Sequence, residues 1–495
     1  MNGNSAVSAA TLASVVIAYF GLLLAVAWRT SRHADNRDFF IGGRRNHWLL
    51  VAFGMVGTSL SGVTFISVPG AVGSSAFSYF QIVMGQLVGY LMVAWILLPL
   101  YYRLNLTSIY SFLDERLGQR AYRTGASFFI LSRTLGATAR LYLVVAILQE
   151  VILDRLGMPF WLTATVLLIM ILLYTFEGGV KTIVWTDTLQ TACMLGGLVT
   201  CTFFLLDALR MDFAGSLAVL DAKGLSQIIV TDVLSPAFFG KQFIAGIFIA
   251  ITMTGMDQEM MQKNISVKTL GDAQKNMVLL ALAMLVVVLT FLYLGGLLQL
   301  FAERAALAAR GDALFPAVVM NYLPALVQLI FVIALISALF PSADGAITAL
   351  TSSFCIDILG LGRNGVNATN EAAIKRTRHR VHLAFATLFL ALVLIFKEVG
   401  NPSMIGLILK IATYTYGPLL GLFAYALLMR RQPDPRWIPL VAVAAPLICL
   451  LLDFNQSWLL GGYRLGLEIL PINGGLTMLG LWLISAQKSA PAARH

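Results

Sequence analysis

Two acidic side chains stand inside apolar stretches of this sequence. Asp187 lies near the start of the stretch 182–209, and Asp344 lies in the stretch 326–357. An unpaired carboxylate inside a bilayer costs a few kcal/mol or more, so such residues usually bind a cation, carry a proton or pair with a base. Because hard oxygen ligands suit small cations, we predict that Asp187 and Asp344 bind sodium. A proton site or a structural salt bridge is the alternative for each.

Three basic side chains also stand inside apolar stretches. Arg133 and Arg140 are about two helical turns apart and share a helix face, and Lys410 lies in the stretch 402–429. A guanidinium can hold a carboxylate through two hydrogen bonds. We predict that Arg133 binds a carboxylate of the solute, that Lys410 is an outer stepping charge or gate partner, and that Arg140 snorkels outward. Pairing with an aspartate of another helix is the alternative.

The stretch 48–73 carries a break that could position these groups. Its middle, Gly57–Gly62, contains two glycines and three hydroxyl residues where a simple membrane anchor would carry Leu and Ile. A non-helical turn at this depth is tolerated where it lines a cavity, and it offers carbonyl oxygens to a cation. We predict that Ser59, Ser61 and Thr64 face the solute. A packing face of small residues is the alternative.

A proline interrupts the apolar stretch that contains Asp344. Ala338 and Ser342 share one helix face, and Pro341 lies between them. A proline inside a helix frees the carbonyl four residues back, here Ser337, which then becomes available as a cation ligand. A simple kink is the alternative.

Composition indicates a polytopic membrane protein. Hydrophobic residues make up 59% of the 495 residues and charged residues 12%, whereas soluble domains carry about 25% charged residues. The net charge of +10 does not indicate nucleic-acid binding, because most basic residues fall in short loops on one predicted side and no DNA-binding motif accompanies them. The sequence shows no catalytic nucleophile with a base and no metal spacing among its five histidines. We therefore expect neither an enzyme nor an organic cofactor.

The apolar stretches predict about 13 transmembrane helices. Basic residues follow the first stretch, which indicates a retained first helix with the N-terminus outside and the C-terminus inside. The predicted spans are 6–28, 48–73, 78–102, 122–153, 158–176, 182–209, 239–257, 276–302, 326–357, 381–397, 402–429, 437–453 and 466–487.

Two interruptions five spans apart suggest an internal repeat. The second lies at Thr252–Gln258, and paired breaks in corresponding helices are the best sequence indication of a transporter's binding site. The predicted units are 1–47 (an extra helix and cytoplasmic loop), 48–210 (first five-helix repeat), 211–238 (extracellular loop), 239–430 (second five-helix repeat) and 431–495 (C-terminal helices).

Several motifs together resemble those of the solute:sodium symporter family, over roughly 10–430. They are DFFIGGR (38–44), SLSGVTFISVPG (59–70), LPLYYRLNLTSIYSFLDERLG (98–118), YTFEGGVKTIVWTDTLQ (174–190), GMDQEMMQKNISVKTLGDAQK (255–275) and SALFPSADG (337–345). The resemblance implies an all-α fold with a five-plus-five inverted-repeat core of the LeuT type and alternating access.

The resemblance also implies ligands. The family's sodium site falls on the carbonyls of Gly57, Leu60 and Ala338 and on the hydroxyl of Ser342, where this chain has one hydroxyl residue instead of the usual adjacent pair. Asp187 resembles an acid that some members use for a second sodium ion, and Asp344 resembles an aspartate of the proline- and pantothenate-like branches. Gln86 is similar to a substrate-facing position.

We therefore predict a sodium-coupled symporter of a small polar solute, with a carboxylate as the class that Arg133 favours. Its partners would be the solute, sodium and the lipid bilayer, without nucleic acid, and we expect a monomer in a bacterial inner membrane. Proton-coupled or uncoupled transport by the same fold is the alternative. A passive channel is disfavoured by the paired breaks, and a sensor domain by the short segment after the last span, 488–495.

Overall fold

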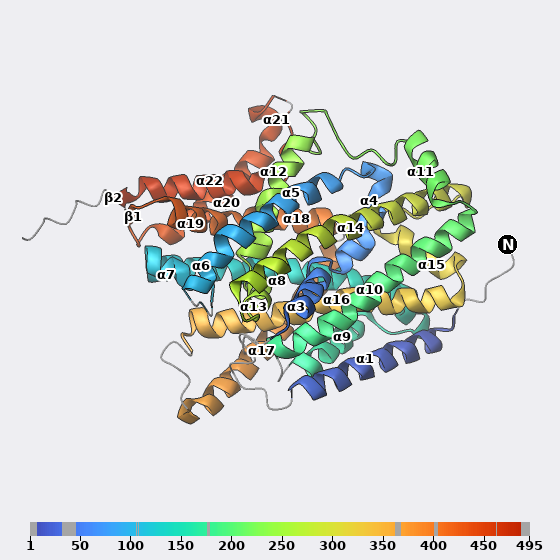
Figure 1. Cartoon of the computed structure of the whole chain (residues 1–495), viewed down its shortest axis with the longest axis horizontal. Helices are drawn as coiled ribbons and strands as arrows, with labels where there is room; N and C mark the ends of the chain where they lie inside the picture. Colours follow the sequence, from blue (N-terminus) through green and yellow to red (C-terminus); the bar gives the residue numbers. More distant parts are fainter. Residues whose placement is uncertain are drawn as a thin grey trace, which may run out of the picture.

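The computed structural model folds as a bundle of helices that run along the long axis of Figure 1. It describes residues 7–31, 46–104, 106, 108–175, 179–361, 368–399, 404–461 and 463–486. The predicted motif 38–44 and the segment 488–495 lie outside these residues. Within the described part, the only sheet is the antiparallel pair of β1 (Gln432–Pro433) and β2 (Ser485–Ala486).

In the part of the chain that the structure describes, seven helices are long and apolar enough to cross a membrane. One of them is continuous from α5 through a π-helical turn into α6, and all seven coincide with predicted spans. They are built from α1 (Ala9–Ser31), α5 (Phe80–Met92) with η2 (Val93–Leu97) and α6 (Leu98–Arg103), α8 (Gln119–Leu148) with η3 (Gln149–Leu153), α10 (Gly179–Leu209), α14 (Leu270–Arg304), α16 (Ala325–Ser353) with η7 (Phe354–Ile358), and α17 (Ala368–Val399).

Three further candidate spans are bent pairs, so the described residues contain up to ten spans by length and composition. The pair α3 (Trp48–Ser59) and α4 (Gly62–Ser75) bends by 53°, and α12 (Phe239–Ala250) with η5 (Ile251–Gly255) bends by 68° into α13 (Gln258–Asn264). The two interruptions predicted from glycine and hydroxyl residues are therefore confirmed. A third bend, of 44° between α18 (Met404–Thr415) and α19 (Gly417–Leu428), was not predicted.

Shorter helices account for the other predicted spans and for the connections. Three apolar helices of 15 to 17 residues coincide with predicted spans: α9 (Phe160–Thr175), α20 (Ile438–Phe454) and α22 (Ile469–Leu483). The remaining elements are α7 (Ser111–Leu117), η4 (Asp154–Leu156), α11 (Phe213–Ala222), η6 (Gly311–Ala313), α15 (Leu314–Tyr322) and α21 (Gln456–Leu459).

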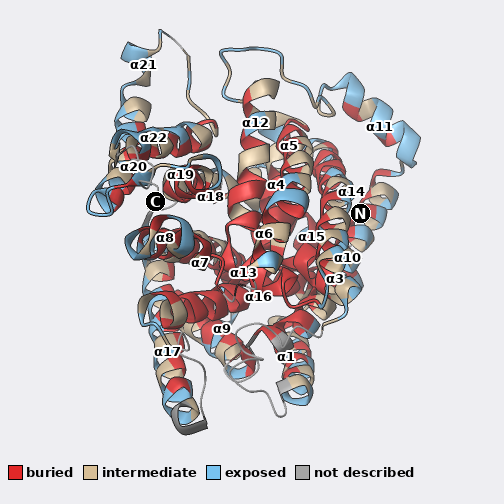
Figure 2. Ribbon diagram, turned by 60° about the vertical axis from the view of Figure 1, so that its left-hand side comes forward, coloured by how far each residue is buried: buried red, intermediate tan, exposed pale blue. Residues whose placement is uncertain are grey.

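Burial increases from the rim of the bundle to the broken helices. Figure 2 shows α16 and α13 among buried segments, whereas α1 and α17 lie at the edge. Within the most apolar part of each span, 72% of α16 is buried but only 17% of α1. Large apolar side chains such as Ile17, Phe203 and Val286 are exposed, as expected of surfaces that face lipid. The fold therefore places α3, α13 and α16, which carry the predicted ion-binding residues or their neighbours, in its interior.

Candidate functional site

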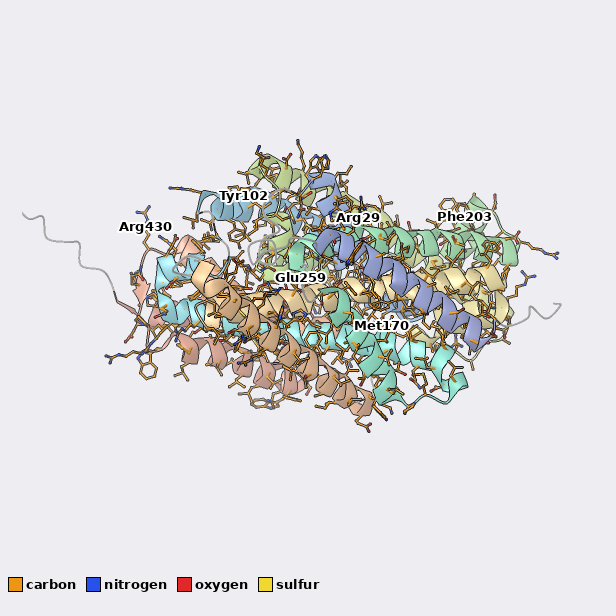
Figure 3. All side chains as sticks on the ribbon, turned by 90° about the horizontal axis from the view of Figure 1, so that it is seen from below. Arg29, Tyr102, Met170, Phe203, Glu259 and Arg430 are labelled. Carbon is orange, nitrogen blue, oxygen red and sulfur yellow. The ribbon has the colours of Figure 1, made fainter. Side chains whose placement is uncertain are left out.

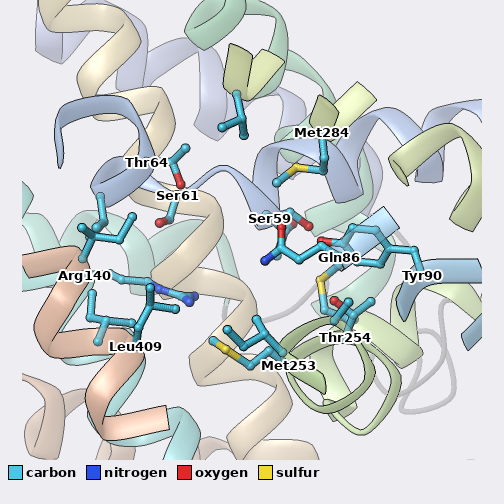
Figure 4. A pocket seen from close by; sticks show the side chains of 18 of the residues that line it. Ser59, Ser61, Thr64, Gln86, Tyr90, Arg140, Met253, Thr254, Met284 and Leu409 are labelled. Carbon is cyan, nitrogen blue, oxygen red and sulfur yellow. The ribbon is translucent and has the colours of Figure 1, made fainter. Parts of the chain in front are cut away.

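A cavity lies beside the break between α3 and α4. It contains about 780 Å³ of space between atoms, and this volume includes space that is open to the surroundings. Figure 4 shows Ser61 and Thr64 on one side of the cavity, Gln86 and Tyr90 on the other side, and Met253 at the bottom of the view. The lining residues come from α3, α4, α5, α8, α12, η5, α13, α14 and α18.

The break forms where the backbone leaves helical geometry at Leu60 and Ser61. Ser61 adopts φ −38° and ψ 170°, and α4 begins at the following residue. Among the described residues, no donor reaches the carbonyls of Gly57 or Leu60, because the hydrogen bonds of the last turn of α3 stop at Leu60 N–H to Val56 O (2.9 Å). These carbonyl oxygens are therefore available to a ligand, as the sequence predicted for this turn.

The turn packs against the part of α16 that carries the other predicted sodium ligands. A Cβ atom placed on Gly62 would lie 3.7 Å from the carbonyl oxygen of Ala338. The hydroxyl of Ser342 donates to the carbonyl of Leu339 (2.8 Å), which leaves its lone pairs free. The helix continues through Pro341, whose ring nitrogen cannot bond to the carbonyl of Ser337.

Five of the six residues predicted to bind substrate line the cavity. They are Ser59, Ser61, Thr64, Gln86 and Arg133. The sixth, Lys410, lies away from the cavity: its ammonium pairs with Asp453 at 2.9 Å, and its side chain is 61% exposed. The predicted role of Lys410 as a stepping charge gains no support from this position, because α18 turns Ile408 and Leu409 towards the cavity instead.

Arg133 forms an ion pair with acids of another helix, the alternative that the sequence left open, rather than waiting for a carboxylate of the solute. Its guanidinium pairs with the buried carboxylate of Glu259, and its Nη1 lies 3.9 Å from Asp257 Oδ2. Both acids belong to the α13 segment, which begins immediately after the second break. Figure 3 labels Glu259 near the centre of its view, and the side chains of Arg133 and Glu259 are only 5% and 2% exposed. Arg133 Nε is buried and lacks a hydrogen-bond partner among the described residues.

Arg140, rather than Arg133, is the arginine of α8 that faces the cavity without an acidic partner among the described residues. It lines the cavity, and Figure 4 shows its side chain extending inward from α8. In the described part of the chain, no acidic oxygen lies within 4.0 Å of its guanidinium, whereas both Arg133 and Lys410 have such partners. The signal for it was present in the sequence, because Arg133 and Arg140 share a helix face, but only the packing distinguishes the paired arginine from the unpaired one.

Asp187 forms the salt bridge that the sequence left open as an alternative. Its Oδ2 lies 2.7 Å from Lys263 Nζ and accepts a hydrogen bond from the Thr58 hydroxyl at 3.1 Å. Lys263 belongs to α13, and sequence reasoning missed it by assigning it to a cytoplasmic loop. Its ammonium also contacts Glu259 Oε1 at 3.2 Å. Asp187 therefore already has a cationic partner from the protein.

Asp344 lies near this ion cluster without joining it. Its Oδ2 accepts a hydrogen bond from the Tyr174 hydroxyl at 2.7 Å, and its Oδ1 accepts one from the Gly345 N–H at 2.5 Å. The next residue, Gly345, packs so closely that a Cβ there would meet Glu259 Oε1 and Lys263 Nζ. The two predicted acids thus reach the same buried region from α10 and α16.

Comparisons of this chain with known proteins agree on one family. A model described as the sodium:solute symporter family matches residues 39–434. The chain is 28% identical over 259 residues to the human sodium/iodide cotransporter, covering 51% of this chain and 39% of that protein. It is 23% identical over 415 residues to the human sodium-coupled monocarboxylate transporter 1, covering 80% and 64%. Each alignment therefore spans less than two thirds of the relative's length. The Proteus mirabilis sodium/sialic acid symporter SiaT is 21% identical over 446 residues, covering 84% of each chain.

Solved structures support the fold. A substrate-bound, outward-open Na⁺-coupled sialic acid symporter matches with a TM-score of 0.81 at 17% identity, covering 96% of this chain and 99% of the other. A nucleobase-cation-symport-1 family transporter in a closed conformation matches with a TM-score of 0.55 at 12% identity, covering 90% and 93%. At these identities, the likeness establishes the architecture alone. The identity of the ligand has to be inferred from the residues that line the cavity.

Proposed function

Because the chain belongs to the sodium:solute symporter family, we propose that it moves a small carboxylate-bearing solute together with sodium by alternating access. The observation that carries the substrate class is Arg140, a cation that lines the cavity and has no acidic partner within 4.0 Å in the described part of the chain. A charge in such a partly dehydrated place is costly until an anion joins it. The solute's carboxylate fills that requirement.

The rest of the cavity fits a small amphipathic anion. The hydroxyls of Ser61 and Thr64 and the amide of Gln86 provide hydrogen bonds, and Gln86 Oε1 lacks a partner among the described residues. Met253 and Ile408 add apolar contacts. Two relatives, by their names, carry monocarboxylates and sialic acid, and both classes of solute contain a carboxylate.

Sodium would bind on the α16 side of the same break. The proposed ligands are the carbonyls of Gly57, Leu60 and Ala338 and the hydroxyl of Ser342, with the freed carbonyl of Ser337 in place of a second hydroxyl. Oxygen atoms of this kind suit a small hard cation. Sodium bound there would fix the turn that presents Ser61 to the cavity, so each ligand would stabilise the conformation that the other needs.

The two bent pairs support the proposed repeat and topology. The breaks in α3–α4 and in α12–α13 stand at the starts of the proposed units 48–210 and 239–430, which would have opposite orientations, with the N-terminus of the chain outside and the C-terminus inside. The cavity is lined by both proposed units of one chain, which supports a monomer as the transporting unit. The likeness to a bacterial symporter over 84% of each chain favours a bacterial inner membrane.

The test is uptake into proteoliposomes by the parent protein and by Arg140 variants. We expect uptake of a labelled small carboxylate, but not of its amide, to require Na⁺ outside and to be lost when K⁺ replaces it. Arg140→Lys keeps the charge without the two-pronged geometry and should lower affinity by about tenfold, and Arg140→Gln by more. Lys410→Gln is the matched control, because Lys410 is a cation outside the cavity. Equal uptake of acid and amide would refute the substrate class, and uptake driven by a proton gradient in K⁺ would refute sodium coupling.

A further inference from the structure

The ammonium group of Lys263 is enclosed by three oxygen atoms. Asp187 Oδ2 and Thr58 Oγ1 lie at 2.7 Å from Nζ, and Glu259 Oε1 lies at 3.2 Å. The side chains of Lys263, Asp187 and Glu259 are at most 3% exposed. An ammonium has three protons, so each proton has an acceptor. The coordination of this buried cation is therefore complete without a ligand from outside.

The enclosing groups come from three different elements. Thr58 belongs to α3, immediately before the break, Asp187 to α10, and Glu259 with Lys263 to α13. The Thr58 hydroxyl accepts a hydrogen bond from Lys263 and donates one to Asp187 Oδ2 at 3.1 Å. The ammonium thus connects three helices through hydrogen bonds, as a metal ion bound at the same place would connect them through coordination.

The ion pairs of this cluster form a continuous line, with Asp257 beside Arg133 at one end. Arg133 pairs with Glu259, Glu259 also contacts Lys263, and Lys263 pairs with Asp187. Two bases and two acids alternate along this line, so a second cation at Asp187 would meet the ammonium at close range in a buried, weakly screened place. Sodium could use Asp187 only after Lys263 had moved away and left Glu259 with less compensation.

We propose that Lys263 is a built-in counter-cation that takes the place of a second sodium ion at Asp187, and that it fixes the transport stoichiometry at one sodium ion per solute. This inference rests on the proposed sodium coupling through the break in α3–α4. The oxygens of Asp187, Thr58 and Glu259 form a cation site. Because the ammonium of Lys263 fills this site, Lys263 determines which ions the protein binds there.

Binding of ²²Na⁺ to the purified full-length protein tests the inference without knowledge of the solute. We expect one bound sodium ion per chain in the parent, and one in Lys263→Arg, which keeps the cation. Lys263→Ala leaves the acidic oxygens uncompensated and should bind a second sodium ion. The double variant Lys263→Ala, Asp187→Asn should return to one.

A further variant keeps the test decisive if Lys263→Ala does not fold. Asp187→Asn in the parent background should still bind one sodium ion, because Asp187 is paired with Lys263 rather than with sodium. Two sodium ions bound to the parent, one lost in Asp187→Asn, would overturn the inference and leave the proposed function intact. A Lys263→Ala protein that folds and still binds one would also overturn it. Absence of any saturable ²²Na⁺ binding by the parent would instead refute the proposed sodium coupling.

Discussion

Glu259 offers a direct measurement of what the buried charges contribute to the fold. Its carboxylate is shared between Arg133 and Lys263, and all three side chains are at most 5% exposed. In Glu259→Gln the shape is kept, but two cations lose one acid. Removing one partner of a buried ion pair typically costs about 3–5 kcal/mol. Arg133 retains Asp257 at 3.9 Å and Lys263 retains Asp187 at 2.7 Å, so we expect the lower end, about 3 kcal/mol.

The chain contains a matched control for this substitution. Glu303 pairs with Lys223 at 2.6 Å, a good distance for an ion pair, but its side chain is 65% exposed. Exposed pairs contribute about 0–1 kcal/mol, so Glu303→Gln should change stability little. Both variants replace a glutamate that forms an ion pair by glutamine, and the two sites differ in how deeply the glutamate is buried.

Thermal stability in detergent, followed by the fraction that remains monodisperse after heating, distinguishes the two variants. Comparison at one heating rate is needed, because unfolding of such proteins is commonly irreversible. We expect Glu259→Gln to lower the apparent melting temperature by several degrees and Glu303→Gln to leave it nearly unchanged. Adding Lys263→Met to Glu259→Gln should lower the apparent melting temperature further, because the buried Asp187 then loses its cationic partner. Equal melting temperatures for the two glutamine variants would refute the reasoning that the buried charges hold α13 in place.

Two further predictions concern the sodium site and the topology. Ser342→Ala removes the one side-chain oxygen proposed to bind sodium, so the sodium concentration for half-maximal ²²Na⁺ binding should rise about tenfold, or about 1.4 kcal/mol; an unchanged value would exclude Ser342 as a ligand. Single cysteines at the exposed positions Ser74 and Ala373, in a background without native cysteines, should react with an impermeant maleimide from opposite sides of the membrane; reaction of both from one side would contradict the proposed orientation.

The sequence was informative where a local cause determines the structure. The break at Leu60 and Ser61 follows from flanking glycines and hydroxyls that weaken the helix, and the break before Gln258 follows from a similar run. The third bend, at Tyr416, also had a local signal: Pro418 follows Gly417 and restricts the residue before it. The apolar stretch 402–429 is nevertheless long enough for a single straight span, so its length does not predict the bend.

The pairing of charges could not be predicted in the same way. Arg133 and Arg140 have the same chemistry and share a helix face, and the difference between them depends on where α13 places Glu259. Lys263 follows the break at a distance typical of a loop, and the 68° bend returns it to the interior instead. Partner choice among buried charges depends on interhelical distances, and periodicity along one chain contains no information on them.

The hydroxyl of Tyr416 has a consequence for how movement passes through the bundle. It stands at the bend between α18 and α19 and donates to Asp257 Oδ2 at 3.0 Å, and Asp257 caps the first turn of α13. The same α18 supplies Ile405, Ile408 and Leu409 to the cavity wall. A swing of α18 over a bound solute must therefore either stretch this hydrogen bond or turn α13 with it. Tyr416 therefore links the helix that contributes Ile408 and Leu409 to the cavity wall with the helix that carries Lys263, and a displacement of one would be transmitted to the other through this hydrogen bond.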